Sequence, residues 1–400
     1  MKRNFQYSKY FARFLDRIYD WLWRPLEFYA LTYDITSFLP YATLLPHVQS
    51  RGIYLGRDEV HRQVYINFNR LPSGSGVILG PIGYGKSTLA RTIALRCLNA
   101  NPRIIPISLD PTGEYAVWAS RCGIKVLDMF TYTINPFDTL GIVEPKLVIK
   151  RTTDFLENIF DLWDEQTSNL YHTALKLSEE RGYDEYGRAR FTLKDVLDEL
   201  DRSHPLNRDL IAKLELTASH FSKPSTIDAK SLVMKREPVV VTYKSGRRRL
   251  DRDTSIFLSL SFIRQFWDVN EFLGYRHYVE HLIFLDEAYW LMKVGAQFLS
   301  EAVRQTRKLS IGFVIISHFK SDIPESILKN VSWIFATAGG EKYVDELSTL
   351  IGFHSELRDK LLFGEVGEGI LALANYPRPV YLKVEPEELA LVGEVKPLAT

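Results

Sequence analysis

Short apolar runs recur along the 400-residue chain, and each has the length and composition of a buried strand. Unbroken stretches of Val, Ile, Leu and Phe are typical of parallel sheets that helices cover on both faces. The runs lie at residues 77–79, 104–109, 239–243, 282–285, 313–316, 333–336 and 370–373, and a further pair at 53–58 and 64–67 has the pattern of a hairpin. The sequence therefore predicts an α/β fold, a RecA-like P-loop domain with a mainly parallel central sheet.

Between residues 143 and 235 the apolar positions change to helical spacing. One predicted helix carries Phe155, Leu156, Ile159, Phe160, Leu162 and Trp163 on its apolar face. Another begins at Thr192, which has Asp195 three residues on as a capping partner. We predict an all-helical insertion within one sheet domain. The predicted parts are an N-terminal arm at 1–50, the first part of the ATPase domain at 51–142, the insertion at 143–235, the second part of the domain at 236–384 and a C-terminal tail at 385–400.

The N-terminal arm has an amphipathic helical pattern with a basic polar face. Such a helix suits a membrane surface, and it suits packing on the protein's own body or on a neighbouring subunit equally well. The uncharged stretch at 35–50 contains two prolines and is shorter than a spanning helix. The apolar stripe comprises Tyr7, Tyr10, Phe11, Phe14, Leu15, Ile18, Tyr19 and Leu22, flanked by Lys2, Arg3, Lys9, Arg13 and Arg17.

Composition narrows the class of protein. A hydrophobic fraction of 46% excludes wholesale disorder. A net charge of +1 excludes a global basic field, so nucleic acid would have to be held by local loops. Two cysteines make no disulfide framework, which indicates a reducing compartment. We therefore expect a cytoplasmic protein, peripheral at the cytoplasmic face of the membrane if the arm binds lipid.

A glycine-rich turn follows the apolar run at 77–79 and precedes a helical stripe. It matches the phosphate-binding pattern G-x-x-x-x-G-K-[ST] without a mismatch. In such a loop backbone N–H groups surround the phosphates, and the positive end of the next helix adds to them. Lys86 would reach the β- and γ-phosphates, and the Ser87 hydroxyl would hold Mg²⁺. The sequence predicts an ATP and Mg²⁺ site whose cofactor-binding residues are Gly80, Gly83, Gly85, Lys86, Ser87 and Thr88.

Two adjacent carboxylates, Asp286 and Glu287, follow the apolar run at 282–285. At the carboxyl end of a parallel strand, Asp286 can contact the Mg²⁺ held by Ser87. Glu287 can then align and deprotonate an attacking water. A nucleotide-binding switch has no need of this second acid, whereas a hydrolase does. The pair therefore predicts hydrolysis.

Two further candidates follow along the chain. Arg304 and Arg307 share one face of a helix predicted at 297–308, and Arg307 at a subunit edge could stabilise phosphoryl-transfer charge in a neighbouring protomer. The alternative is that Arg304 and Arg307 pair with Glu301 or another carboxylate on a solvated face. His318 ends the run at 313–316 and could sense the γ-phosphate or its water.

A basic segment follows the run at 239–243 and contains Gly246. Clustered positive charge without base-reading side chains suits contact with the DNA backbone irrespective of sequence. A solvated loop offset by Asp251 and Asp253 explains the same pattern. The candidate DNA-binding residues are Lys244, Arg247, Arg248 and Arg249.

The order of these motifs resembles the FtsK–HerA superfamily of DNA-pumping ATPases, and within it the HerA-like and type IV secretion (conjugation) branch. The matching segments are Gly80 to Ser87, Asp110-Pro-Thr-Gly-Glu-Tyr115, Asn135-Pro-Phe-Asp138, Asp286-Glu-Ala-Tyr-Trp290, and Arg307 to His318. The resemblance implies a homohexameric ring that hydrolyses ATP to move DNA through its central hole. The family usually carries glutamine at the position of His318, and protonation of a histidine there would make hydrolysis pH-sensitive.

We therefore predict a DNA-translocating ATPase for DNA transfer, import or packaging, with a membrane channel protein as a partner through the N-terminal arm. One alternative is a HerA-like translocase that works with a nuclease in DNA end resection. Another is an ATP-dependent secretion or assembly factor that acts on protein.

Overall fold

The structure of the chain is a computed structural model, and it describes residues 52–376, 378–386 and 388. The predicted N-terminal arm and most of the predicted C-terminal tail lie outside these residues. Within the described ranges, no helix is both long enough and apolar enough to cross a membrane.

One eleven-stranded sheet runs through the molecule, in the order β2-β1-β13-β12-β11-β3-β10-β9-β4-β6-β5. The strands from β11 to β5 are parallel to one another, and those from β2 to β11 pair in antiparallel fashion. The predicted α/β class with a mainly parallel sheet is confirmed. The parallel strands are β11 (Trp333–Thr337), β3 (Gly76–Leu79), β10 (Ile311–Ser317), β9 (His281–Leu285), β4 (Ile105–Asp110), β6 (Val239–Thr242) and β5 (Lys125–Asp128). The others are β12 (Glu368–Leu373), β13 (Val380–Val384), β1 (Ile53–Asp58) and β2 (Gln63–Ile66).

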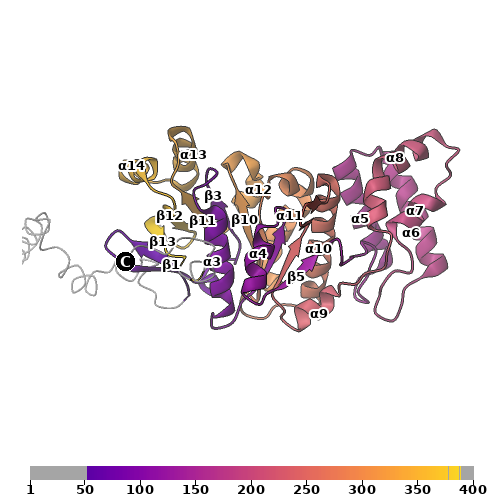
Figure 1. The fold of residues 1–400 in the computed structure, drawn as a ribbon, viewed down its shortest axis with the longest axis horizontal. Helices are drawn as coiled ribbons and strands as arrows, with labels where there is room; N and C mark the ends of the chain where they lie inside the picture. Colours follow the sequence, from indigo (N-terminus) through magenta and orange to yellow (C-terminus); the bar gives the residue numbers. More distant parts are fainter. Residues whose placement is uncertain (1–51, 377, 387, 389–400) are drawn as a thin grey trace, which may run out of the picture.

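Helices cover both faces of the parallel strands (Figure 1). On β3, Ile78 packs in the core beneath α3 (Lys86–Leu98) and α4 (Glu114–Arg121). Val77 and Leu79 belong to the opposite core, together with α10 (Arg252–Leu273) and α11 (Tyr289–Leu309). Because successive side chains of a strand point to opposite faces, both sets must be apolar, and this explains the unbroken apolar runs.

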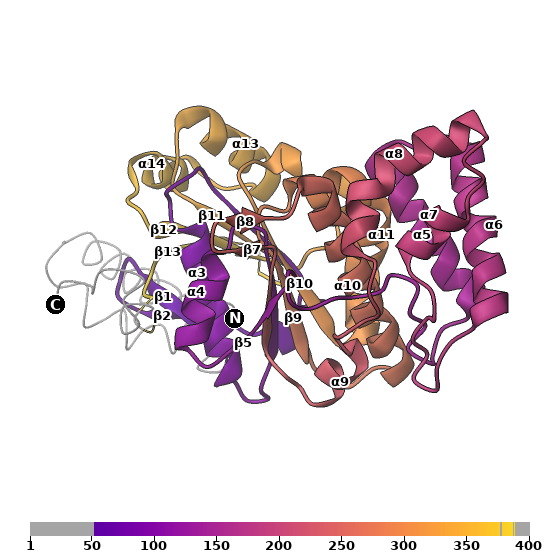
Figure 2. The same ribbon diagram turned by 45° about the vertical axis from the view of Figure 1, so that its right-hand side comes forward.

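The chain between β5 and β6 folds into helices, of which all but the last lie at the end of the molecule away from β1 and β2, while the last packs beside α10 (Figures 1 and 2). The predicted helix through Trp163 ends earlier, at Phe160, because Asp161 adopts the left-handed conformation at φ 50°. The predicted cap is confirmed: Thr192 Oγ1 accepts from Asp195 N at 3.3 Å, and Thr192 N donates to the Asp195 carboxylate at 2.8 Å. The helices are α5 (Pro145–Phe160), α6 (Asp164–Arg181), α7 (Leu193–Glu199), α8 (Pro205–His220) and α9 (Ala229–Met234).

Two long helices differ from the sequence interpretation. The helix predicted at 297–308 begins at Tyr289, because the turn after β9 continues directly into helical hydrogen bonding through Met292 N and Ala288 O. Helix α10 was not predicted at all. The remaining elements are the short hairpin β7 (Lys244–Ser245) and β8 (Arg248–Arg249), the 3-10 turns η3 (Phe68–Arg70) and η4 (Lys320–Asp322), and the helices α12 (Glu325–Leu328), α13 (Glu341–Ile351) and α14 (Ser355–Phe363).

Candidate nucleotide site

The glycine-rich turn joins β3 to α3 with the backbone of a phosphate-binding loop. Gly83 and Gly85 have φ of 86° and 90°, which residues with a side chain rarely adopt. Gly80 has a different requirement, because a Cβ there would lie 2.0 Å from Thr337 Oγ1 on β11. The glycines therefore serve both the curvature of the loop and its close packing on the sheet.

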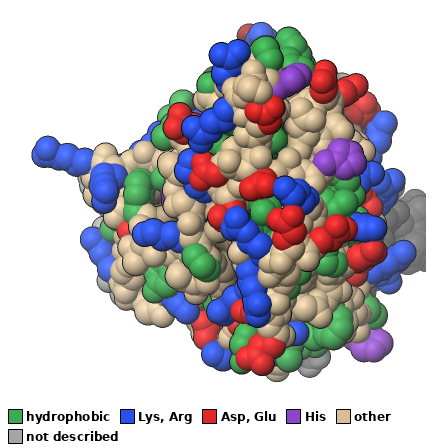
Figure 3. All heavy atoms as spheres, turned by 90° about the vertical axis from the view of Figure 1, so that its right-hand side faces the viewer, with side chains coloured by type: hydrophobic (Ala, Val, Ile, Leu, Met, Phe, Trp, Pro, Cys, Tyr) green, Lys and Arg blue, Asp and Glu red, His purple; other side chains and the backbone are tan. Residues whose placement is uncertain are grey.

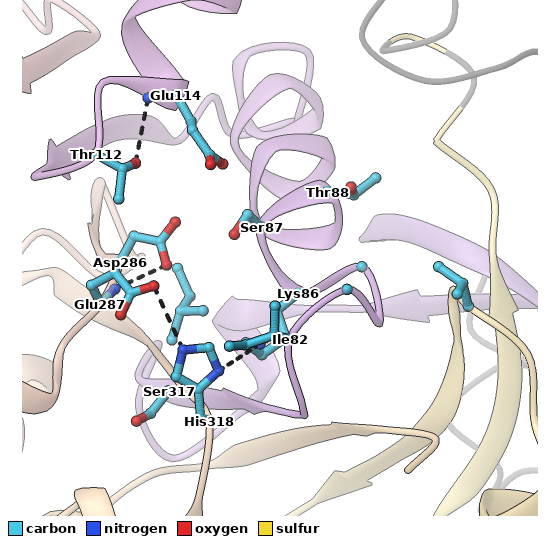
Figure 4. A pocket seen from close by; sticks show the side chains of 14 residues that line it. Ile82, Lys86, Ser87, Thr88, Thr112, Glu114, Asp286, Glu287, Ser317 and His318 are labelled. Atoms are coloured by element: carbon cyan, nitrogen blue, oxygen red, sulfur yellow. Dashed lines mark hydrogen bonds and ion pairs between the residues drawn. The ribbon is translucent and has the colours of Figure 1, made fainter.

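The carboxyl ends of β3, β9 and β10 meet at one edge of the sheet, where they border a cleft of about 360 Å³. Figure 4 shows Lys86, Asp286, Glu287 and His318 pointing toward one another across it. Most of the predicted site residues line this cleft, namely Gly83, Gly85, Lys86, Ser87, Thr88, Asp286, Glu287 and His318. The parallel strand order thus joins two motifs that are about 200 residues apart in the sequence.

Lys86 is only 7% exposed and is held at the floor of the cleft. Its Nζ donates to Pro81 O at 2.9 Å and lies 3.1 Å from His318 Nδ1. Burial lowers the pKa of Lys86, and the charges of Asp286 and Glu287 oppose that shift. An ammonium group can only donate, so His318 Nδ1 accepts and its proton resides on Nε2. That Nε2 lies 3.6 Å from Glu287 Oε1, so His318 bridges the lysine and the glutamate (Figure 4).

Asp286 has the surroundings of a metal ligand. The pKa of its carboxyl is raised to about 6, chiefly by burial, and the charges of Glu287 and Asp110 contribute to that rise. Hydrogen bonds from Glu287 N, at 2.9 Å, and from the Ser87 hydroxyl oppose the shift. A hard divalent cation prefers oxygen ligands and would neutralise this charge. Ser87 and Asp286 therefore fit the predicted Mg²⁺.

Glu287 is held in a strained conformation. Its φ of 51° lies in the left-handed region, which costs a residue with a side chain about 1–2 kcal/mol. The hydrogen bond from Ala288 N to Ile316 O at 3.2 Å fixes the turn against β10. The Glu287 side chain is 45% exposed and faces the cleft. A carboxylate in this position can accept a proton from a water in the cleft.

Arg307 does not line the cleft. It lies in the last turn of α11 and borders a small cavity with Asn69 and Tyr275, at the amino end of β10. The cleft lies at the other end of that strand, roughly 20 Å away for seven extended residues. Arg304 and Arg307 are exposed, and no ion pair to either is found among the residues described here. The pairing with Glu301 is thus not formed.

The basic segment forms the β7–β8 hairpin, and its four candidate side chains differ in environment. The stem of Lys244 packs on Gly113, where a Cβ would lie 3.1 Å from Lys244 Cδ. The Arg248 guanidinium lies 5.3 Å from the centre of the Phe130 ring. Arg249 borders a second cavity next to the cleft, and Arg247 occupies the exposed turn.

Six residues that line the cleft were not among the predicted site residues: Ile82, Thr112, Glu114, Ile316, Ser317 and Val366. Thr112 and Glu114 belong to the Asp-Pro-Thr-Gly-Glu-Tyr segment after β4, the strand next to β9. Since carboxyl ends of adjacent parallel strands share an edge, this position could have indicated both. Val366 follows α14, and only tertiary structure brings it to the phosphate loop.

Two other motif residues have structural surroundings. Asp110 is fully buried and caps α4, accepting from Gly113 N and Ala116 N at 2.9 Å each. Asp138 accepts from Ala189 N at 2.8 Å and from the Ser225 hydroxyl. Both Ala189 and Ser225 belong to the helical interval, so Asp138 anchors that interval to the end of β5 and its following loop.

Comparison with known proteins agrees with this geometry. Residues 52–243 match the family model described as the central domain of helicase HerA. The predicted resemblance to the FtsK–HerA superfamily is confirmed. A search of curated proteins found no match to this sequence.

Solved structures of the superfamily share the fold. VirB4 of Thermoanaerobacter pseudethanolicus superposes with a TM-score of 0.68 at 20% identity, covering 84% of this chain and 97% of that one. The bacterial conjugative coupling protein TrwBΔN70 gives a TM-score of 0.59 at 13% identity, with 86% and 92% covered. The plasmid coupling protein TrwB in complex with ADP and Mg²⁺ gives 0.57 at 13% identity, with 87% and 92% covered. The chain therefore has the P-loop NTPase fold of these superfamily proteins.

Proposed function

We propose that the chain is an ATPase that assembles as a hexameric ring and moves DNA, in a transfer system of the conjugation or type IV secretion kind. The observation that carries the proposal is the single cleft shared by Lys86, Ser87, Asp286 and Glu287. A nucleotide-binding protein needs the first two, and the second two add a metal ligand and a base. The similarity to the HerA central domain favours DNA as the moved substrate.

The chemistry follows from the positions of these residues. The phosphate loop and Lys86 bind the β- and γ-phosphates. Ser87 and Asp286 would hold Mg²⁺, and a bound Mg²⁺ would supply positive charge against the charge that develops on the phosphates. Glu287 takes the proton of the attacking water. His318 leaves Lys86 when a γ-phosphate enters, and its Nε2–H then holds Glu287 toward the water.

The visible face of the helical end is not uniformly positive, so it does not offer a surface suited to the DNA backbone. Figure 3 views that end and shows Lys and Arg side chains interspersed with Asp and Glu over the visible face. Ion pairs such as Lys176–Glu199 at 2.6 Å and Arg181–Asp195 at 2.7 Å account for part of this mixture. We propose that the DNA backbone contacts the β7–β8 hairpin, where the basic residues cluster.

The test is the steady-state ATPase rate with and without long double-stranded DNA, measured across protein concentration. We expect strong stimulation by DNA, a concentration threshold from ring assembly, and a steep fall of stimulation with salt as counterions are released. A rate that ignores DNA would contradict the motor and favour the secretion or assembly factor that acts on protein. Lipid flotation of the intact chain against one lacking residues 1–50 tests the membrane role of the arm.

The ring predicts that Arg307 acts on a neighbouring cleft, because it is remote from its own. In rings mixed from wild-type and Arg307→Ala subunits, activity should fall out of proportion to the fraction of variant. A strictly linear response would indicate a structural role for Arg307. The exposed Arg304 on the same helix provides the matched control, as Arg304→Ala.

A further inference from the structure

A second cavity, of about 290 Å³, adjoins the nucleotide cleft. Thr112, Asp286 and Glu287 border both spaces, so they form a shared wall. The far side of the second cavity is built by the first turns of α10 and α11 and by the β7–β8 hairpin. This cavity plays no part in the nucleotide chemistry described above.

Two arginines supply the positive charge of the second cavity, which the carboxylates of Asp286 and Glu287 also border. Arg249 enters from β8 and Arg252 from the first turn of α10. The Arg252 guanidinium lies 4.3 Å from the centre of the Trp290 ring, and its Nε donates to Asp253 at 3.2 Å. A guanidinium that stacks through its face keeps its remaining in-plane N–H groups free to donate to a phosphate. The pair thus offers a planar, cationic site with an aromatic wall.

The β7–β8 hairpin also contacts the loop that borders the nucleotide cleft. Lys244 packs on Gly113, in the loop that carries Thr112 and Glu114 into the cleft. Gly113 has φ 81° and directly precedes α4, so the Lys244 stem contacts this loop at the start of that helix. Leu250 N donates to Tyr243 O at 3.0 Å and ties the base of the hairpin to the end of β6.

We propose that the second cavity binds a phosphate of the DNA backbone between Arg249 and Arg252, and that this phosphate positions Glu287. The bound negative charge lies across the shared wall from the Glu287 carboxylate and repels it toward Lys86 and His318 in the cleft. Arg249 and Arg252 are therefore positioning residues, which act on hydrolysis through Glu287. This inference rests on the proposed function, because it takes DNA as the substrate.

The experiment compares the ratio of ATPase rates with and without saturating double-stranded DNA, so that changes in basal rate cancel. Arg249→Met keeps the bulk of the side chain without its charge and should reduce the ratio to within about twofold of unity. Arg249→Lys should recover most of the stimulation, since a structural role would not be rescued by charge alone. Arg208→Met is the control: Arg208 is exposed on α8, outside the hairpin, and does not border the cavity, so this variant should keep at least half of the wild-type ratio.

Trp290 provides an independent readout. DNA should change the tryptophan emission of the wild type but not that of Trp290→Phe, because the ring lies under Arg252. If Arg249→Met kept the wild-type ratio of ATPase rates with and without saturating DNA, this inference would be overturned, while the proposed function would stand. Wild-type turnover that DNA does not stimulate would overturn the proposed function, and the inference with it.

Discussion

Burial raises the carboxyl pKa of both Asp286 and Asp138 to about 6, yet the two side chains have different surroundings. Asp138 is 1% exposed and accepts hydrogen bonds from Ser225 and Ala189 N, with the charge of Arg264 nearby. Asp286 borders an open cleft and faces a hydroxyl, a second carboxylate and a buried lysine. The two carboxyls therefore share a shifted pKa but not a role.

The comparison shows that a displaced pKa alone does not identify a functional site. At Asp138 the nearby protein donors use the acceptor capacity of the carboxylate, so the group holds the helical interval in place. Asp286 likewise accepts from a backbone N–H and a hydroxyl, but the negative charges of Glu287 and Asp110 lie near it beside an open cavity, which leaves room for a metal ion and phosphates. The following predictions distinguish residues that act in the cleft from residues that stabilise the fold.

The largest effect is expected at Glu287, the neighbour of Asp286 in the cleft. Glu287→Gln keeps the shape of the side chain but removes the base, so kcat should fall by about 10²–10⁴. The affinity for a fluorescent ATP analogue should stay within about threefold of wild type. Near-normal hydrolysis by this variant would disprove the general-base assignment. Lys86→Ala, which should abolish binding itself, is the contrasting control.

Asp138→Ala should instead reduce stability. The change leaves the Ser225 hydroxyl and Ala189 N without an acceptor and removes a charge near the buried Arg264. We expect the free energy of unfolding to fall by about 3 kcal/mol, or roughly 150-fold in the folding equilibrium. Urea denaturation measures the loss, and turnover per folded molecule should be retained. Asp286→Ala should instead reduce turnover and leave the stability nearly unchanged. Similar losses of stability for the two variants would contradict the different roles of Asp138 and Asp286.

The next largest effect is expected in the pH dependence of Mg²⁺ binding, which should involve Asp286 and not Asp138. Because the pKa of Asp286 is raised to about 6, protons compete with Mg²⁺ as pH falls through that value. Below it, the apparent Mg²⁺ affinity of the nucleotide complex should fall about tenfold per pH unit. Nucleotide binding titrated with Mg²⁺ between pH 5 and 7.5 gives the profile. Asp286→Asn should bind Mg²⁺ weakly without this dependence, whereas an unchanged profile in that variant would assign the titration to another group.

Much of the fold could be predicted because its strands have an unambiguous pattern. The runs at 282–285 and 313–316 are buried on both faces, so no other element suits them. The phosphate loop follows from spacing, and its place beside Asp286 follows from the shared edge of parallel strands.

Helix α10 escaped prediction for a physical reason. Arg264, Gln265 and Asp268 are buried in it together with its apolar residues, so no polar face marks a helical period. Arg264 and Asp268 pair at 2.9 Å inside the core, which makes their burial possible. The sequence also grouped Lys244 with the three hairpin arginines, since only tertiary contacts distinguish Arg249 at a cavity from Arg248 on Phe130.

The smallest effect is expected inside the helical interval that Asp138 anchors. Thr192→Ala removes the cap of α7, whose hydroxyl accepts from Asp195 N at 3.3 Å. Loss of such a cap costs about 1 kcal/mol, or roughly fivefold in the folding equilibrium. Urea denaturation should show this loss while the DNA-stimulated ATPase rate stays constant. Thr192→Ser retains the hydroxyl and should cost less than half as much. If Thr192→Ala changed turnover as well, the helical interval would be coupled to the cleft, and Asp138 would transmit that coupling rather than serve as an anchor alone.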